Sequence, residues 1–189
     1  MASASRRIAL SSLYIGTRAL ERFLLHRLTD KLQNQHMLRA RLLFDFYRSQ
    51  RNEQGDSSLE LVQNVHRALK PQTRDNLRVG YLKSRKPRAF DLLSGSLAEV
   101  LGVHHIKLYV FDNDVIVTGA NLSHSYFTYR QDRYMMIRGS EELSGRMYDL
   151  VDALVDGSTR FNEDALLEKD PYDNLENYVK MWRFSNRPE

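Results

Sequence analysis

The residues whose types and spacing could perform chemistry lie within 104–134. His105 and Lys107 are two apart in an apolar, β-branched run, and side chains at i and i+2 of a strand point to the same face. Asp112 follows at a turn, and Asn121 lies in a small polar loop. A histidine can attack phosphorus, and lysine and amide groups can stabilise phosphoryl oxygens. These residues indicate phosphoryl transfer, in which we expect no metal ion and no cofactor.

The spacing of these residues is His-x-Lys, four residues, Asp, six residues, Gly. It resembles the signature of the phospholipase D superfamily. The sequence segments around it resemble those of the mitochondrial phosphatidylglycerophosphate synthases, the CDP-diacylglycerol–glycerol-3-phosphate 3-phosphatidyltransferases, from about residue 6 to about residue 155. These segments are SLYIG (12–16), LFD (43–45) with Arg48, GANLS (119–123), YFT (126–128) and RQDRY (130–134).

Two features depart from the family pattern. Tyr129 stands where the family usually has Asn, and the chain carries one signature where the family carries two. No other histidine has a lysine two residues on. We therefore expect the chain to be the N-terminal half of such an enzyme. The second motif would come from a homodimer partner or from a missing C-terminal half.

The resemblance implies that a phosphatidyl group passes from CDP-diacylglycerol to glycerol-3-phosphate through a phosphohistidine. The products would be CMP and phosphatidylglycerophosphate, a precursor of phosphatidylglycerol and cardiolipin. His105, Lys107 and Asp112 would be the catalytic residues. The resemblance also implies a mitochondrial, membrane-peripheral enzyme. Its partners would be the two substrates and an anionic membrane surface, and we do not expect nucleic acid.

The carboxylates of the motif region have separate expected roles. Asp112 is seven residues after His105 and lies at the turn, so we expect it to hold the hairpin rather than to touch substrate. Asp132 is eleven residues after Asn121, where superfamily members place a carboxylate that hydrogen-bonds the catalytic histidine. Such a bond would fix the tautomer and the orientation of the ring.

Further side chains are expected to bind substrate. The loop containing Asn121 is one residue shorter than the commonest superfamily loop, so we expect Ser123 to replace the missing serine hydroxyl. Arg130 and Arg133 could bind a phosphate, or they could pair with nearby acidic residues. Arg48 lies just beyond a predicted strand, at the edge where open α/β sheets bind ligands.

Other functions of different classes stay open. A phosphatidylserine synthase-like transferase would use the same donor with serine as acceptor. A homodimeric phosphodiesterase or nuclease of the same superfamily would carry one signature per chain. An inactive lipid-binding fragment is the outcome expected if the chain remains monomeric.

Composition limits the class of protein. The 189 residues have a net charge of +4, which suits an acidic partner, and 42% of them are hydrophobic. The absence of cysteine excludes disulfides, a thiol nucleophile and thiolate zinc sites. No apolar run approaches the ~18 residues that cross a bilayer. The Ser/Arg-rich start resembles a transit peptide only weakly, because residues 8–15 already read as a strand.

Alternating strands and helices predict an α/β fold, one phospholipase D-like half with a mixed β-sheet flanked by helices on both faces. This half-domain would span 1–157, followed by a tail at 158–189 with a short helix near 172–184. Residues 83–101 are basic and then leucine-rich; they form either a loop with a core helix or a flap on an anionic membrane.

Strands are predicted at 6–15, 39–46, 76–82 and 133–138, and one further strand is predicted on each side of the turn at Asp112. Helices are predicted at 18–33, 58–69 and 140–155. Thr17 would cap the first helix, whose core stripe would be Leu20, Phe23, Leu24, Leu28 and Leu32.

Overall fold

The computed structural model describes residues 3–53, 55–83, 104–162 and 165–167. Two predictions lie outside these ranges. They are the leucine-rich helix or membrane flap that follows Lys83, and the short helix near 172–184.

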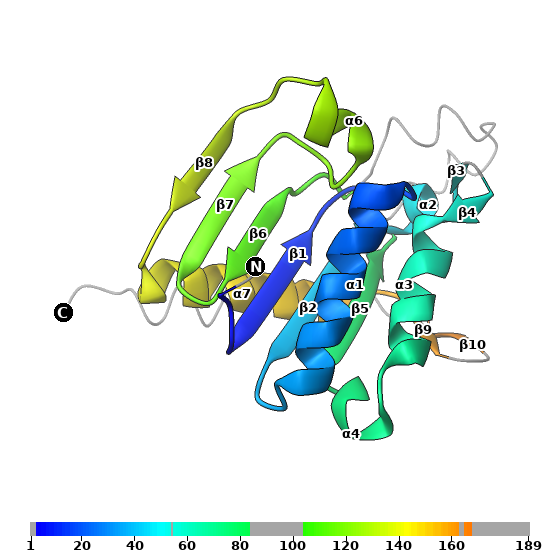
Figure 1. Ribbon diagram of the computed structural model, residues 1–189, viewed down its shortest axis with the longest axis horizontal. Helices are drawn as coiled ribbons and strands as arrows, with labels where there is room; N and C mark the ends of the chain where they lie inside the picture. Colours follow the sequence, from blue (N-terminus) through cyan, green and yellow to red (C-terminus); the bar gives the residue numbers. More distant parts are fainter. Residues whose placement is uncertain (1–2, 54, 84–103, 163–164, 168–189) are drawn as a thin grey trace, which may run out of the picture.

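A six-stranded mixed sheet forms the centre of the molecule (Figure 1). Its spatial order is β5-β2-β1-β6-β7-β8. Strands β1, β2 and β5 are parallel, whereas β6, β7 and β8 are antiparallel to their neighbours. The bounds are β1 Arg7–Ser11, β2 Arg39–Asp45, β5 Leu77–Leu82, β6 Leu108–Phe111, β7 Asp114–Thr118 and β8 Tyr134–Ile137.

Helices cover both faces of this sheet. Helices α1 (Ala19–Asn34) and α3 (Ser58–Ala68) connect the parallel strands and lie on one face, while α7 (Glu141–Gly157) crosses the other (Figure 1). Each face has its own buried core, one built with α1 and α3 and the other with α7. The predicted α/β class, with a mixed sheet between helices, is confirmed.

Short elements complete the described fold. A β-hairpin follows α2, and a second hairpin follows α7, where Thr159 pairs with Tyr81 of β5. Their bounds are α2 Phe46–Ser49, α4 Pro71–Arg74, α6 His124–Thr128, β3 Asn52–Glu53, β4 Asp56–Ser57, β9 Arg160–Asn162 and β10 Ala165–Leu167.

Local capping sets where the long helices begin. At α3 the Ser57 hydroxyl accepts from the Glu60 N–H, and the Glu60 carboxylate accepts from the Ser57 N–H, which is a capping box. At α7 the Ser140 hydroxyl accepts from the Leu143 N–H. Such caps typically stabilise a helix by ~1 kcal/mol each. These two helices therefore begin where the sequence predicts.

Helix α1 buries only part of its predicted stripe: Leu28 and Leu32 are fully buried and Leu24 packs against the core. Leu20 and Phe23 are 43% and 63% exposed, whereas Glu21 is fully buried. The Glu21 carboxylate accepts from the His124 N–H at the start of α6, so the helix is rotated to bring an acidic residue inward. Thr17 does not cap the helix either, because its hydroxyl donates to the Glu53 carbonyl.

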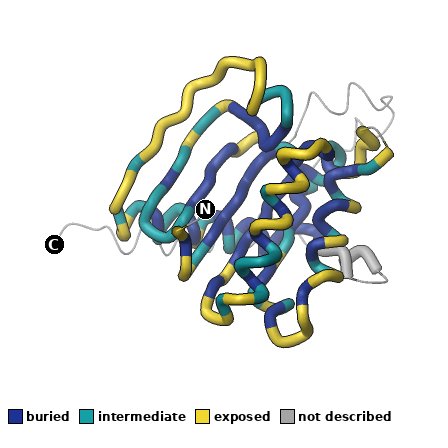
Figure 2. Tube along the Cα trace, in the orientation of Figure 1, coloured by how far each residue is buried: buried dark blue, intermediate teal, exposed yellow. Residues whose placement is uncertain are grey.

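Burial falls from the centre of the sheet toward β8. Figure 2 shows the central strands buried and β8 exposed along its length. Tyr134, Met135 and Met136 of β8 are 52%, 63% and 48% exposed. Of the helices in the described ranges, none combines the length and the apolar character needed to cross a bilayer.

Candidate active site

The segment that carries His105 lies at the carboxyl end of β1, because the end of β1 pairs with the start of β6. The sequence predicts His105 and Lys107 inside a strand, but β6 begins one residue after Lys107. The backbone of His104 and Ile106 bonds instead to the side chains of Asp45 and Ser11, whereas the Lys107 carbonyl accepts from the Thr118 N–H of β7. His105 is thus presented on a tethered loop at the strand end.

His105 and Lys107 are brought together, at different depths. His105 is exposed, whereas Lys107 is only 4% exposed. The Lys107 Nζ donates to the backbone oxygen of His105 at 3.0 Å. The ammonium group therefore lies against the backbone of His105, whose side chain is exposed.

The electrostatics of this pair suit a nucleophile beside an electrophilic group. Burial, followed by the charge of Lys107, lowers the pKa of His105, so its imidazole is neutral and has a free lone pair near pH 7. Burial lowers the pKa of Lys107 to about 8, and the negative charge of Asp132 opposes that shift. Lys107 is therefore mostly cationic at neutral pH.

The loop between β7 and α6 places Asn121 in the same region. Asn121 is 6% exposed, and its Oδ1 accepts from the hydroxyl of Ser12, which is fully buried at the end of β1. The same hydroxyl accepts from the Leu122 N–H at 3.3 Å. Among the described residues nothing accepts a hydrogen bond from the Asn121 amide nitrogen. That group can therefore donate to a phosphoryl oxygen.

Asp132 differs from its predicted role. Within the described residues its carboxylate accepts from the backbone N–H groups of Gly119 at 3.2 Å and Arg133 at 2.7 Å, and not from the ring of His105. The short loop after β7 brings the Gly119 N–H to the carboxylate, which explains the difference. Asp132 still acts on the site, because its charge raises the pKa of Lys107 against the effect of burial.

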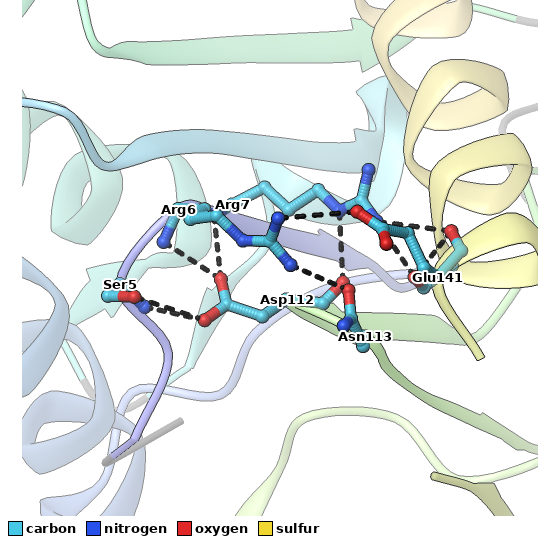
Figure 3. Close-up of polar contacts among 7 residues, drawn as sticks. Ser5, Arg6, Arg7, Asp112, Asn113 and Glu141 are labelled. Atoms are coloured by element: carbon cyan, nitrogen blue, oxygen red, sulfur yellow. Dashed lines mark hydrogen bonds and ion pairs between the residues drawn. The ribbon is translucent and has the colours of Figure 1, made fainter. Parts of the chain in front are cut away.

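Asp112 lies at the β6–β7 turn, at the far end of β6 from His105. The four residues of β6 between them span about 13 Å, at about 3.3 Å each. Figure 3 shows its carboxylate facing the start of β1, where it accepts from the N–H groups of Ser5, Arg6 and Arg7 at 2.8, 2.8 and 2.9 Å. Its backbone has a positive φ of 53°. Asp112 therefore holds the hairpin against β1, as predicted from the turn, and its place among the catalytic residues is not supported.

Three of the predicted substrate-binding residues gather around aromatic rings. The guanidinium of Arg48 lies 5.0 Å from the ring centre of Tyr14, and that of Arg130 lies 5.0 Å from the ring centre of Tyr126. The Tyr14 hydroxyl donates to the Ser123 hydroxyl at 3.4 Å. Two stacked cations and a serine thus lie beside the end of β1, where they could bind an anion.

Arg133 is not part of this group. Its backbone N–H donates to Asp132, and its side chain is exposed. In the part of the chain that the structure describes, neither Arg130 nor Arg133 forms an ion pair with a carboxylate. The alternative in which these arginines pair with Asp132 is therefore not realised.

Buried polar residues that were not predicted from the sequence lie behind the site. Ser11 and Ser12 are fully buried, and His104 is 4% exposed. Small polar residues at the end of an otherwise apolar strand were a signal that could have indicated them.

Among the described residues, no three His, Asp or Glu side chains gather as potential metal ligands.

Curated proteins related to the chain share one name. A stretch of 175 residues is 36% identical to mitochondrial CDP-diacylglycerol–glycerol-3-phosphate 3-phosphatidyltransferase of Mus musculus, and 176 residues are 36% identical to that of Homo sapiens. Both matches cover 87% of this chain and 30% of the relative. The chain therefore spans about a third of the length of these relatives. No family model matches it.

Solved structures support the fold. Phosphatidylserine synthase of Haemophilus influenzae Rd KW20 has a TM-score of 0.58 at 22% identity, over 96% of this chain and 38% of that one. Nuc from Salmonella typhimurium, a phospholipase D family member, has a TM-score of 0.56 at 11% identity, over 88% of this chain and 85% of that one. The chain thus has a phospholipase D-like fold and is related in sequence, over most of its own length, to the mitochondrial CDP-diacylglycerol–glycerol-3-phosphate 3-phosphatidyltransferases.

Proposed function

We propose that this chain carries the nucleophilic half of a phosphatidyltransferase that moves a phosphatidyl group from CDP-diacylglycerol to glycerol-3-phosphate. One observation carries the proposal: the buried ammonium of Lys107 bonds to the backbone of His105, whose imidazole is exposed, in a chain related to such enzymes. Asn121 adds an amide at the same strand ends. A neutral imidazole with cationic and amide donors nearby suits attack on a phosphorus atom.

The proposed first step forms a bond between a ring nitrogen of His105 and the phosphorus that carries diacylglycerol. The bond from that phosphorus to the bridging oxygen breaks, and CMP leaves with the electron pair. Lys107 and the Asn121 amide would neutralise the charge that grows on the phosphoryl oxygens. In the second step the 1-hydroxyl of glycerol-3-phosphate attacks the phosphorus, and the phosphorus–nitrogen bond breaks.

A second acid–base group is needed to protonate the leaving group and then to deprotonate the alcohol, a contribution of typically ~10²–10⁴-fold. We infer that a histidine outside this copy of the chain supplies it, either in a second copy or in a further part of the enzyme. The mass of the protein in solution separates these sources. A dimer that turns over substrate supports the first, and a monomer that stops after the first step supports the second.

The remaining predicted residues would bind the substrates. Arg48 and Arg130, stacked on their tyrosines, would bind phosphate groups, and Ser123 would position them. Arg133 is kept as a weaker candidate, since its side chain is exposed on the loop before β8. The relatives are named mitochondrial, and we extend to this chain a mitochondrial, membrane-peripheral location.

The test is to incubate the purified chain with CDP-diacylglycerol in detergent micelles and to measure CMP release and the mass of tryptic peptides. We expect a phosphatidyl adduct on His105. His105→Asn should abolish it and leave the free energy of unfolding within about 1 kcal/mol, because the side chain is exposed. His26→Asn, at another exposed histidine, is the matched control and should keep the adduct.

Two outcomes would contradict the proposal. One is an adduct that persists in His105→Asn. The other is cleavage of single-stranded DNA without CMP release, which would favour the phosphodiesterase or nuclease alternative. Use of serine rather than glycerol-3-phosphate by a complete system would instead identify the phosphatidylserine synthase-like reaction.

A further inference from the structure

A single buried carboxylate connects the His105 segment to a neighbouring part of the site. Asp45 is fully buried at the end of β2. Its Oδ1 accepts from the N–H groups of Tyr47 at 3.0 Å and Arg48 at 2.8 Å, which caps α2. Its Oδ2 accepts from the N–H of His104 at 3.0 Å. Both oxygens of Asp45 thus face donors: one set follows Asp45 directly in the sequence, and the other donor lies 59 residues after it.

A buried hydroxyl from β1 anchors the same segment a second time. Ser11 is fully buried, and its Oγ donates to the backbone oxygen of Ile106 at 3.0 Å. The Oγ also lies 2.8 Å from Nε2 of His104. Since a hydroxyl has one hydrogen, which is used on Ile106, Nε2 of His104 must carry the proton and donate to Ser11. The ring of His104 is thereby locked in one tautomer and one orientation.

These contacts bracket His105 in the sequence. Asp45 holds the N–H of His104. Ser11 holds both the ring of His104 and the carbonyl of Ile106. The carbonyl of His105 accepts from Lys107. The pairing of β6 with β7 reaches back to the Lys107 carbonyl, which accepts from the Thr118 N–H, and side-chain contacts hold the residues before it. The side chains of His105 and Ile106 face solvent, and of these two only the imidazole can act as a nucleophile.

We propose that Asp45 and Ser11, the latter acting through His104, are positioning residues that hold the imidazole of His105 in front of the ammonium of Lys107. The inference rests on the proposed role of His105 as the nucleophile. It assigns His104 a structural part, not that of a second acid–base group. The low pKa of His104, which burial and then the charge of Lys107 reduce to about 4, agrees with a ring that stays neutral.

Asp45→Asn isolates one of the two links that Asp45 makes. Asn is as good a helix cap as Asp, so its oxygen can keep the bonds to Tyr47 and Arg48. Its amide group would then face the N–H of His104, donor against donor. The variant should therefore release the His105 segment while α2 stays capped.

Ser11→Ala isolates the second anchor, and the chain offers a close control for it. Ser158 is also fully buried, and its hydroxyl donates to the backbone oxygen of Val155 at 2.8 Å, far along the chain from His105. Ser158→Ala removes a hydrogen bond of the same type. A general loss of stability should affect both serine variants alike, whereas loss of positioning should appear only in Ser11→Ala.

The first readout needs no enzymatic activity. Diethyl pyrocarbonate modifies neutral imidazole, so its rate at His105, measured by tandem mass spectrometry against pH, gives the pKa of that ring. In the wild type and in Ser158→Ala the midpoint should lie below the ordinary value of 6.5, because of burial and the charge of Lys107. In Ser11→Ala and Asp45→Asn the ring should move away from Lys107, and the midpoint should rise toward 6.5.

The second readout is the rate of adduct formation against donor concentration. A displacement of ~1 Å can cost ~10²-fold in rate, so we expect a loss of at least ~10-fold in the maximal rate for both variants. The half-saturating donor concentration should change little. Thermal melts would confirm that the variants fold. If Asp45→Asn does not fold, the result for Ser11→Ala decides whether these residues position His105.

Unchanged midpoints and rates in folded Ser11→Ala and Asp45→Asn would overturn the inference. So would equal effects in Ser11→Ala and Ser158→Ala. The failure of the proposed function is distinguishable: a wild-type chain that forms no adduct refutes the reaction, while the modification midpoints still decide whether these residues position His105.

Discussion

Gly119 lies directly against the carboxylate of Asp132. The Gly119 N–H donates to Oδ1 at 3.2 Å, and a Cβ at this position would lie 2.8 Å from each carboxylate oxygen. That distance is shorter than a van der Waals contact, so a side chain and the carboxylate cannot both occupy the place. The glycine of the signature is thus explained by the approach of Asp132 rather than by a special backbone angle.

The first prediction is that Gly119→Ala displaces Asp132 and slows adduct formation on His105 by ~10-fold or more. The rate with CDP-diacylglycerol is the measurement. Gly145→Ala, inside α7, is the control, because its Cβ would meet only the end of the Arg7 side chain at 3.3 Å. That change should stabilise the helix by roughly 0.5–1 kcal/mol and keep the rate. A Gly119→Ala chain with the wild-type rate would contradict the prediction.

The second prediction concerns Asp112, which we expect to stabilise the fold rather than the reaction. Burial alone would raise the pKa of this carboxyl, but hydrogen bonds from Arg7, Ser5 and Arg6 together lower it below the ordinary 3.8. A carboxyl with a depressed folded pKa stabilises above its unfolded pKa, and the contribution is lost as the pH falls through the folded value. Asn tolerates the positive φ of the turn, so Asp112→Asn keeps the backbone but removes the charge and turns an amide nitrogen toward one of the N–H groups that the carboxylate accepts from.

Asp112→Asn should therefore lower the free energy of unfolding at pH 7 by about 1–2 kcal/mol, as measured by urea denaturation. The difference from wild type should shrink as the pH drops below about 4. Asp114→Asn is the control at the neighbouring turn position, where the carboxylate accepts only from the Gly139 N–H among the described residues. A large loss of adduct formation with full stability in Asp112→Asn would instead make this residue catalytic.

Much of the fold was predictable because its signals are local. The capping box of Ser57 and Glu60 and the cap at Ser140 depend on residues three apart. The turn at Asp112 likewise depends on a short polar interruption between apolar runs. The sequence therefore predicted the order of strands and helices and the two-faced sheet.

The arrangement behind His105 was not predictable in this way. The bonds from Asp45 and Ser11 to its flanking residues span 59 and 95 residues of sequence. Apolar alternation continues through Ile106, so the pattern extends the strand too far. The burial of Glu21 was not predictable for a related reason. Glu21 and Leu25 lie on the same face of the helix, but an acidic side chain is not expected in a core. Contacts of this kind are decided by the tertiary fold.

The third prediction is a bell-shaped dependence of adduct formation on pH. His105 must be neutral to attack, so the rate should rise as the pH passes its pKa, which lies below 6.5. Lys107 must be protonated, so the rate should fall as the pH passes about 8. In Lys107→Arg the guanidinium stays charged, and the alkaline fall should disappear although the maximal rate drops. An alkaline fall that persists in Lys107→Arg would assign it to another group.

The fourth prediction separates the charge of Asp132 from its hydrogen bonds. An Asn side chain can still accept from the N–H groups of Gly119 and Arg133, so Asp132→Asn should keep the loop in place. It removes the negative charge that raises the pKa of Lys107. Without that charge the pKa of Lys107 falls further below about 8, and the alkaline limb of the pH profile should move to lower pH. The measurement is the midpoint of that limb for adduct formation; a midpoint equal to that of the wild type would mean that Asp132 acts only through the loop.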